Sequence, residues 1–205
     1  MKTKKGFTFI EVVLVLAIAG LIFAMTFVAL PGLFASQRDT DRREDVMGFI
    51  STLKNYQSNN SRGALPGTST ENRRLEQDNG VVEIQFDGNG EMTYPTGKID
   101  DTSWAGFYRD YFDKNTFVDP DGPRYEWVIM TCKEGASNSD GYKTCNNSQL
   151  TALYNDRFGS NATAYKMFIV TSAICYGGEA VYSNNIRRVA ALYRLEGGGV
   201  YCENT

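Results

Sequence analysis

The sequence predicts an α+β fold, in which a long N-terminal α-helix packs on an antiparallel β-sheet head. Three patterns carry this prediction. Residues 12–35 contain no charged side chain, apolar residues then recur at helical spacing over 46–56, and the last third alternates strand-like segments with glycine turns. With 42% hydrophobic and 13% aromatic residues among 205, the chain has enough apolar material for one domain core.

The uncharged run is the first element. It spans 24 positions, and about 20 apolar residues in a helix cross the roughly 30 Å hydrocarbon core of a bilayer. Three lysines lie in the first five residues and no other basic residue occurs before Arg38, so the positive-inside rule places this end in the cytoplasm. A secretory signal would have a shorter apolar run, whereas this one continues into the charged residues 37–45. This pattern predicts a membrane anchor.

The helix should continue beyond the membrane in amphipathic form, because apolar side chains recur at helical spacing. These apolar positions are Val46, Met47, Phe49, Ile50, Leu53 and Tyr56. Residues 59–63 and the pair Pro66-Gly67 then end the helix. The result is one helix of about 50 residues, roughly 80 Å long.

The rest of the chain is expected to form the β-sheet head. The aromatic-rich residues 104–114 fit a short helix, and the turn at 87–90 fits a short hairpin that starts with the strand at 81–86. The predicted strands are 81–86, 125–130, 164–175, 187–195 and 200–202.

A turn at 119–123 precedes the strand at 125–130, and its two carboxylates are weak candidates for a metal site. Asp119 and Asp121 could supply oxygen ligands to calcium. Neither the EF-hand spacing nor its terminal glutamate is present. A simple turn is the favoured interpretation, and no cofactor is predicted.

Composition argues against two classes of function. The chain contains no histidine, which excludes nucleophile–His–acid triads and removes the commonest metal ligand. No nucleophile motif is present either, so no enzymatic activity is expected. The net charge of −3 gives no support for nucleic-acid binding, and loss of the three N-terminal lysines would bring it to −6.

Four cysteines lie in the second half of the chain, and none forms a C-x-x-C pair, so a zinc or thioredoxin-type site is poorly supported. In an exported domain an even number favours two disulfides over four free thiols, with three possible connectivities. We predict the pair Cys132–Cys145, which closes a loop of 14 residues, and the pair Cys175–Cys202, which ties the first tail strand to the last.

Glu11 lies at the cytoplasmic edge of the apolar run, where a carboxylate is costly unless it finds a partner. The sequence Lys4-Lys5-Gly6-Phe7-Thr8-Phe9-Ile10-Glu11, followed by the apolar run, resembles the class III leader of type IV prepilins. The resemblance implies cleavage after Gly6, N-methylation of Phe7 and a role for Glu11 in assembly. It also implies that Gly20 and Pro31 interrupt the helix, as in many pilins.

The same resemblance implies the pilin fold and its domain organisation. Residues 1–6 would be the leader peptide, 7–35 the transmembrane and polymerisation helix, 36–62 its amphipathic second half, and 63–205 the globular head. The implied partners are other copies of the chain in a helical homopolymer, a prepilin peptidase with N-methyltransferase activity, and a platform protein with its assembly ATPase. The precursor would lie in the cytoplasmic membrane and the mature subunit in an extracellular filament.

The expected function is therefore that of a structural subunit, most simply the major pilin of a type IV pilus. In a helical array, Glu11 of one subunit would pair with the Phe7 amine of its neighbour. Two alternatives stay open: a pseudopilin of a type II secretion or competence system, and a minor pilin with an adhesive or DNA-binding head. Glu11 favours a shaft subunit but does not separate a pilus from a secretion piston.

Overall fold

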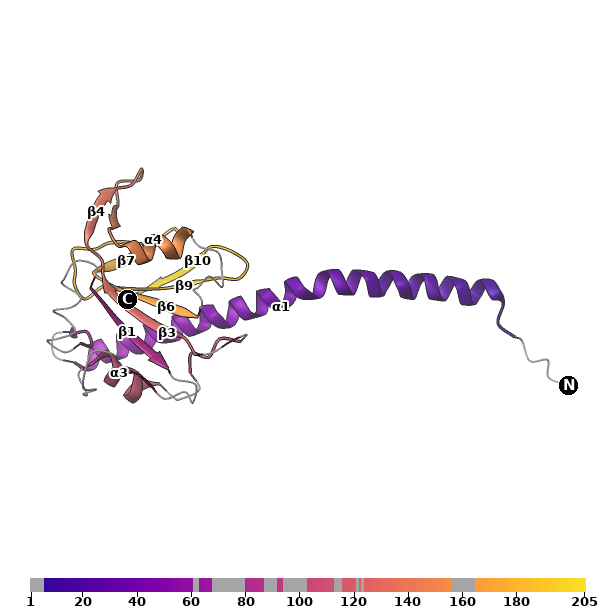
Figure 1. Ribbon diagram of the computed structural model, residues 1–205, viewed down its shortest axis with the longest axis horizontal. Helices are drawn as coiled ribbons and strands as arrows, with labels where there is room; N and C mark the ends of the chain where they lie inside the picture. Colours follow the sequence, from indigo (N-terminus) through magenta and orange to yellow (C-terminus); the bar gives the residue numbers. More distant parts are fainter. Residues whose placement is uncertain are drawn as a thin grey trace. The chain divides into compact units, whose positions relative to one another are not determined.

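The computed structural model describes residues 6–60, 63–67, 80–86, 92–93, 103–112, 116–120, 122, 124–155 and 165–205. The chain divides into two compact units, residues 1–37 and 38–205. Figure 1 shows the long helix α1 (Phe9–Asn59) as the first element, followed by sheets and short helices. The α+β class predicted from the sequence is confirmed.

Helix α1 has 51 residues and includes both Gly20 and Pro31. The expectation that these residues interrupt the helix is therefore wrong. Proline in a helix costs about 3 kcal/mol and glycine about 1 kcal/mol relative to alanine, and a helix this long has many other backbone hydrogen bonds to offset both. The predicted end near residue 59 agrees with the structure.

The second half of α1 packs on the head through one narrow face. Its buried apolar residues are Val46, Phe49, Ile50, Leu53 and Tyr56. Met47 is 44% exposed, so its place in the predicted apolar stripe is wrong. Asp39 and Arg42 lie on the buried face as well, because the spacing of three and four residues that links Val46 to Tyr56 continues back to them.

The main sheet has six strands in the order β10-β9-β6-β3-β1-β2. Their bounds are β1 Val81–Phe86, β2 Met92–Thr93, β3 Glu126–Thr131, β6 Lys166–Thr171, β9 Val189–Arg194 and β10 Val200–Asn204. The pairs β1–β2 and β9–β10 are antiparallel, as expected, but β3 and β6 pair in parallel, so the sheet is mixed. A parallel pair needs a long crossover, and residues 132–165 supply it. The predicted turn at 87–90 lies outside the described residues.

That crossover builds a second layer that the sequence did not predict. It contains β4 (Glu134–Ser137), β5 (Lys143–Cys145) and α4 (Ser148–Asn155). With β7 (Ala173–Tyr176) and β8 (Glu179–Tyr182), these strands form a sheet in the order β4-β5-β8-β7. The single strand predicted at 164–175 is divided into β6 and β7 at Ser172, whose φ of 57° is incompatible with a continuing strand.

The main sheet separates two apolar clusters, because successive side chains of a strand point to opposite faces. On β3, Trp127 and Ile129 join the cluster that contains α1 and α3 (Trp104–Tyr111), whereas Val128 and Met130 join the cluster with α4. Burial on both faces explains why these strands read as continuous apolar runs. Figure 1 shows α4 and β7 on the side of the sheet away from α1.

The structure contains both predicted disulfides. Cys132–Cys145 joins the end of β3 to β5, and Cys175–Cys202 joins β7 to β10. Their sequence separations are 13 and 27 residues. In the chain-entropy account, closing a loop of about 15 residues stabilises the folded state by about 3 kcal/mol, and longer loops give slightly more.

Candidate functional site

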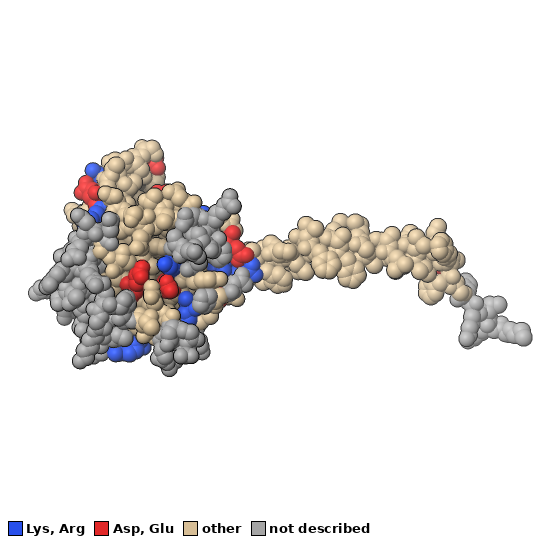
Figure 2. Space-filling view, in the orientation of Figure 1, with Lys and Arg blue, Asp and Glu red and all other residues tan. Residues whose placement is uncertain are grey.

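The first half of α1 presents a long, exposed apolar surface. No residue from Gly6 to Gln37 is buried, and the most apolar 18-residue window of the helix has a mean hydropathy of 2.8. Figure 2 shows this stretch in tan, whereas the charged groups gather on the head. An apolar surface of this length exceeds what soluble monomers expose and marks a membrane or partner interface. By length and composition, the helix is able to cross a membrane.

Glu11 has a defined role within the subunit, as part of the N-terminal cap of α1. Its Oε2 accepts hydrogen bonds from the backbone N–H of Thr8 at 2.8 Å and from the Thr8 hydroxyl at 2.7 Å. The Glu11 N–H donates in return to Thr8 Oγ1 at 3.4 Å. This reciprocal pattern, with threonine at the cap and glutamate three residues on, is a capping box.

The second carboxylate oxygen of Glu11 differs from the first. Among the described residues, nothing donates a hydrogen bond to Oε1. Glu11 and Phe7 line the same hollow of about 520 Å³, together with apolar side chains of the next turns. One oxygen of Glu11 is therefore used in the helix cap, and the other accepts no hydrogen bond from a described residue.

A comparison with protein families identifies this segment. Residues 1–27 match the family model described as the prokaryotic N-terminal methylation motif. The chain carries a type IV pilin-like prepilin leader. No curated protein and no solved structure matches the chain. This leader and the apolar helix that follows it imply processing by a prepilin peptidase and a membrane-anchored precursor.

The head contains a second polar centre, around the buried Arg42. Its Nε and Nη2 donate to the two oxygens of Asp119 at 2.8 and 2.9 Å. Its Nη1 donates to Asp39 at 2.9 Å and to Glu196 at 3.2 Å. Burial alone would lower the pKa of Arg42, but the three carboxylates outweigh that effect and raise it, so the guanidinium stays charged. Tyr193 completes the centre by donating its hydroxyl to Asp119 at 2.9 Å.

Asp39 connects the same centre to the turn between β9 and β10. Its oxygens accept the backbone N–H groups of Glu196 and Gly197, each at 2.8 Å. Arg38 closes the network from outside, through two hydrogen bonds to Glu196 at 2.9 and 2.6 Å, and holds the pKa of Glu196 below its usual range. Helix α1 is thus fixed to the turn at 196–199 by charge and hydrogen bonds as well as by apolar packing.

The geometry around Asp119 does not support a calcium site there. Both of its carboxylate oxygens accept hydrogen bonds from Arg42, and its side chain is fully buried. In the part of the chain that the structure describes, no group of three or more metal-binding side chains occurs. The second candidate, Asp121, lies outside the described residues.

Sequence reasoning missed the roles of Asp39 and Arg42. Both belong to the charged segment at 37–45 that follows the apolar run, and this segment as a whole predicts exposure. The signal that would have found them is spacing: counting back from Val46 in steps of four and three residues gives Arg42 and Asp39.

Asp45 gives the head a pH-dependent stability. Partial burial, with repulsion from Asp41, Asp119 and Glu44, raises the pKa of Asp45 to about 6, against an ordinary value of 3.8. A raised folded-state pKa means that the stabilising contribution is complete below 3.8 and is lost as pH rises through about 6.

We therefore expect Asp45→Asn to gain stability relative to wild type as pH rises from about 4 to about 7. Urea unfolding of the full chain in detergent, followed by tryptophan fluorescence, measures this difference. Glu179→Gln, an exposed carboxylate on β8, serves as the control and should show no such trend. A constant difference between Asp45→Asn and wild type over this pH range would contradict the assignment.

Proposed function

We propose that this pilin-like protein is the major subunit of a type IV pilus. The observation that carries the proposal is the exposed apolar half of α1, which follows a methylation-motif leader and has Glu11 in its first turn. In this proposal, cleavage after Gly6 exposes an amine on Phe7, which becomes N-methylated. Residues 7–35 anchor the subunit in the membrane before assembly and pack against identical helices afterwards.

Assembly then depends on charge as well as on apolar contact. The amine created on Phe7 is positive, and Glu11 Oε1 accepts no hydrogen bond from the described residues. An ion pair between Glu11 of one subunit and Phe7 of the next would be strongly attractive in low dielectric and would fix the axial register of the filament. Because the proposed partner belongs to another subunit, the pair favours the polymer over the membrane-inserted monomer.

The remaining parts have supporting roles in the proposal. Residues 36–62 carry the buried face that holds the head, residues 63–205, to the helix. A prepilin peptidase with N-methyltransferase activity would process the precursor in the cytoplasmic membrane. A platform protein and its assembly ATPase would extract it into an extracellular filament.

The processing step gives a direct test. The mature subunit is expected to begin at N-methylated Phe7, because the matched motif spans the Gly6–Phe7 bond. Mass spectrometry of N-terminal peptides from sheared surface filaments measures this. Filament subunits that retain residues 1–6, or that begin after Ala35, would rule the proposal out. Electron microscopy of the same preparation separates a long surface pilus from the short piston of a pseudopilin.

A further inference from the structure

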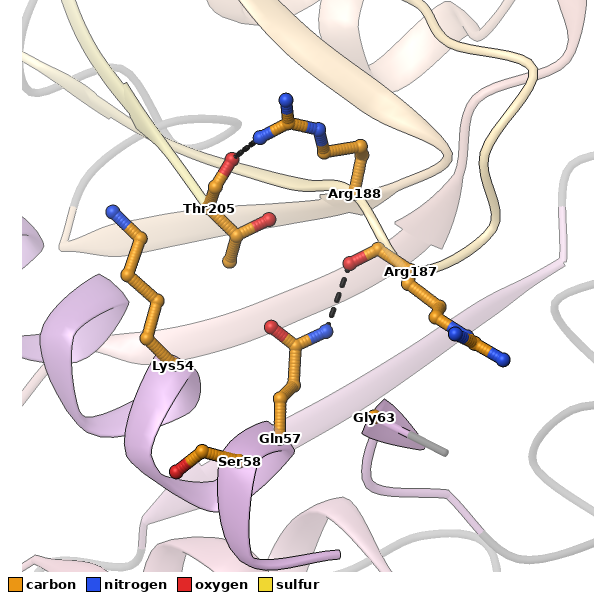
Figure 3. Close-up of a pocket in the computed structure, with 7 residues that line it drawn as sticks. All are labelled: Lys54, Gln57, Ser58, Gly63, Arg187, Arg188 and Thr205. Carbon is orange, nitrogen blue, oxygen red and sulfur yellow. Dashed lines mark hydrogen bonds between the residues drawn. The ribbon is translucent and has the colours of Figure 1, made fainter. Parts of the chain in front are cut away.

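A hollow of about 370 Å³ lies where the end of α1 meets the turn before β9. Its lining residues are Lys54, Gln57, Ser58, Gly63, Arg187, Arg188 and Thr205. Figure 3 shows one cationic side chain from α1 and two from the turn around this region, with the Arg187 guanidinium pointing away from Lys54 and Arg188. Among the described lining residues no side chain is a carboxylate, and Arg188 is already bonded to an oxygen of Thr205. The site is therefore a local concentration of positive charge on a chain whose net charge is −3.

Fixed backbone geometry positions these cations. The Asn185 side chain accepts the N–H of Arg187 at 3.0 Å, and the Asn185 carbonyl accepts the N–H of Arg188 at 3.0 Å. Gln57 Nε2 on α1 donates to the Arg187 carbonyl at 2.8 Å, which joins the turn to the helix. The Arg188 guanidinium donates to the Thr205 carbonyl oxygen. Helix and turn are thus held together around the hollow before any ligand arrives.

The cations of this hollow differ from most others in the head. Ion pairs with carboxylates hold Arg38, Arg42, Arg109, Lys143 and Lys166. Within the described residues, no ion pair holds Lys54 or Arg187. Arg194 on β9 donates instead to the backbone carbonyls of Leu153 and Tyr154, each at 3.0 Å.

We propose that this hollow binds a phosphate group carried on a larger molecule. Guanidinium groups present planar sets of N–H donors that match phosphate oxygens, and the Lys54 ammonium adds a compact positive charge. Binding pockets for small molecules begin at about 300 Å³, so a hollow of about 370 Å³ has room for a phosphate and part of its substituent. The C-terminal end of α1, near Asn59, carries the negative end of the helix dipole. The cationic side chains must therefore overcome its repulsion of a bound anion.

Titration calorimetry of the full chain in maltoside micelles, a detergent without phosphate, tests the proposal. Inorganic phosphate and glycerol phosphate are titrated separately at constant ionic strength. Saturable binding of both is expected, tighter for glycerol phosphate because it uses more of the hollow. Lys54→Gln and Arg187→Gln should each weaken binding by about tenfold, since each removes a charged donor.

Two further variants keep the result interpretable. Lys54→Arg preserves the charge and should retain binding, and Lys143→Gln, which removes a cation from β5, should leave the affinity unchanged. If wild type binds neither phosphate saturably, or if Lys143→Gln weakens binding as much as Arg187→Gln, the proposal is wrong. If wild type binds no phosphate and both Lys54→Gln and Arg187→Gln unfold at a lower denaturant concentration, these side chains have a structural role only. The test uses unassembled protein, so its outcome is independent of filament formation.

Discussion

Replacement of Glu11 by alanine is expected to abolish filaments, or to reduce them sharply, while the precursor is still expressed, cleaved and inserted in the membrane. The change removes the carboxylate proposed to pair with the Phe7 amine of a neighbouring subunit. Removing one partner of such a low-dielectric pair typically costs about 3–5 kcal/mol, which leaves the other charge unpaired at every subunit contact. Filament yield and membrane pool, both measured by immunoblot, give the result.

The capping box makes a second variant necessary. Glu11→Ala also removes the bonds to Thr8, and loss of a helix cap alone costs about 0.5–2 kcal/mol. Glu11→Gln is the matched control, because glutamine can fill the same position in a capping box but carries no charge. If charge pairing drives assembly, Glu11→Gln should fail to form filaments as Glu11→Ala does. Wild-type filament yield from Glu11→Gln, or its equal entry into filaments in a mixed culture, would refute the ion pair.

Replacement of Arg42 by methionine is expected to destabilise the head by about 3–5 kcal/mol. Methionine fills much of the same volume but leaves the Asp119 and Asp39 carboxylates buried without their cation. Urea unfolding of the full chain in maltoside measures the loss, and the buried Trp104 and Trp127 report it by fluorescence. Such a loss is large beside the 5–15 kcal/mol that stabilises a typical domain.

Two comparisons show whether the loss comes from unpaired buried charge. Arg43→Met removes the next cation on α1, an exposed guanidinium over the Tyr201 ring, and should cost no more than about 1 kcal/mol. Adding Asp119→Asn to Arg42→Met should recover part of the stability, because one uncompensated carboxylate is then neutral. Strictly additive losses in the double variant would show that Arg42 and Asp119 act independently.

Much of the architecture follows from local sequence pattern. The uncharged run and the stripe from Val46 to Tyr56 predict α1 to its last turn, because helical periodicity is a strong signal over 50 residues. The strands at β1, β3, β9 and β10 follow from β-branched and aromatic runs between turns. The cysteine pairing follows from loop length and from the strands that each pair connects.

The features that the sequence does not predict depend mainly on contacts between residues far apart in the chain. The parallel pairing of β3 with β6 depends on a crossover whose short strands and α4 carry weak local signals. The break at Ser172 depends on a positive φ at a residue that is not glycine, so the sequence gives no sign of it. The Arg42 centre unites residues from three distant parts of the chain, and a lone arginine in a charged stretch gives no sign of burial.

The bonds from Asp39 to Glu196 and Gly197 span 157 and 158 positions of sequence. Contacts between such remote positions carry a large loop-closure entropy and slow the folding of a domain. Because the chain is made from its N-terminus, Asp39 receives these two donors only after the end of the chain has been synthesised. A chain truncated before Glu196 would keep its apolar helix yet leave Asp39 without these two amide donors. The C-terminal hairpin therefore completes the hydrogen bonding of the stem as well as the edge of the sheet.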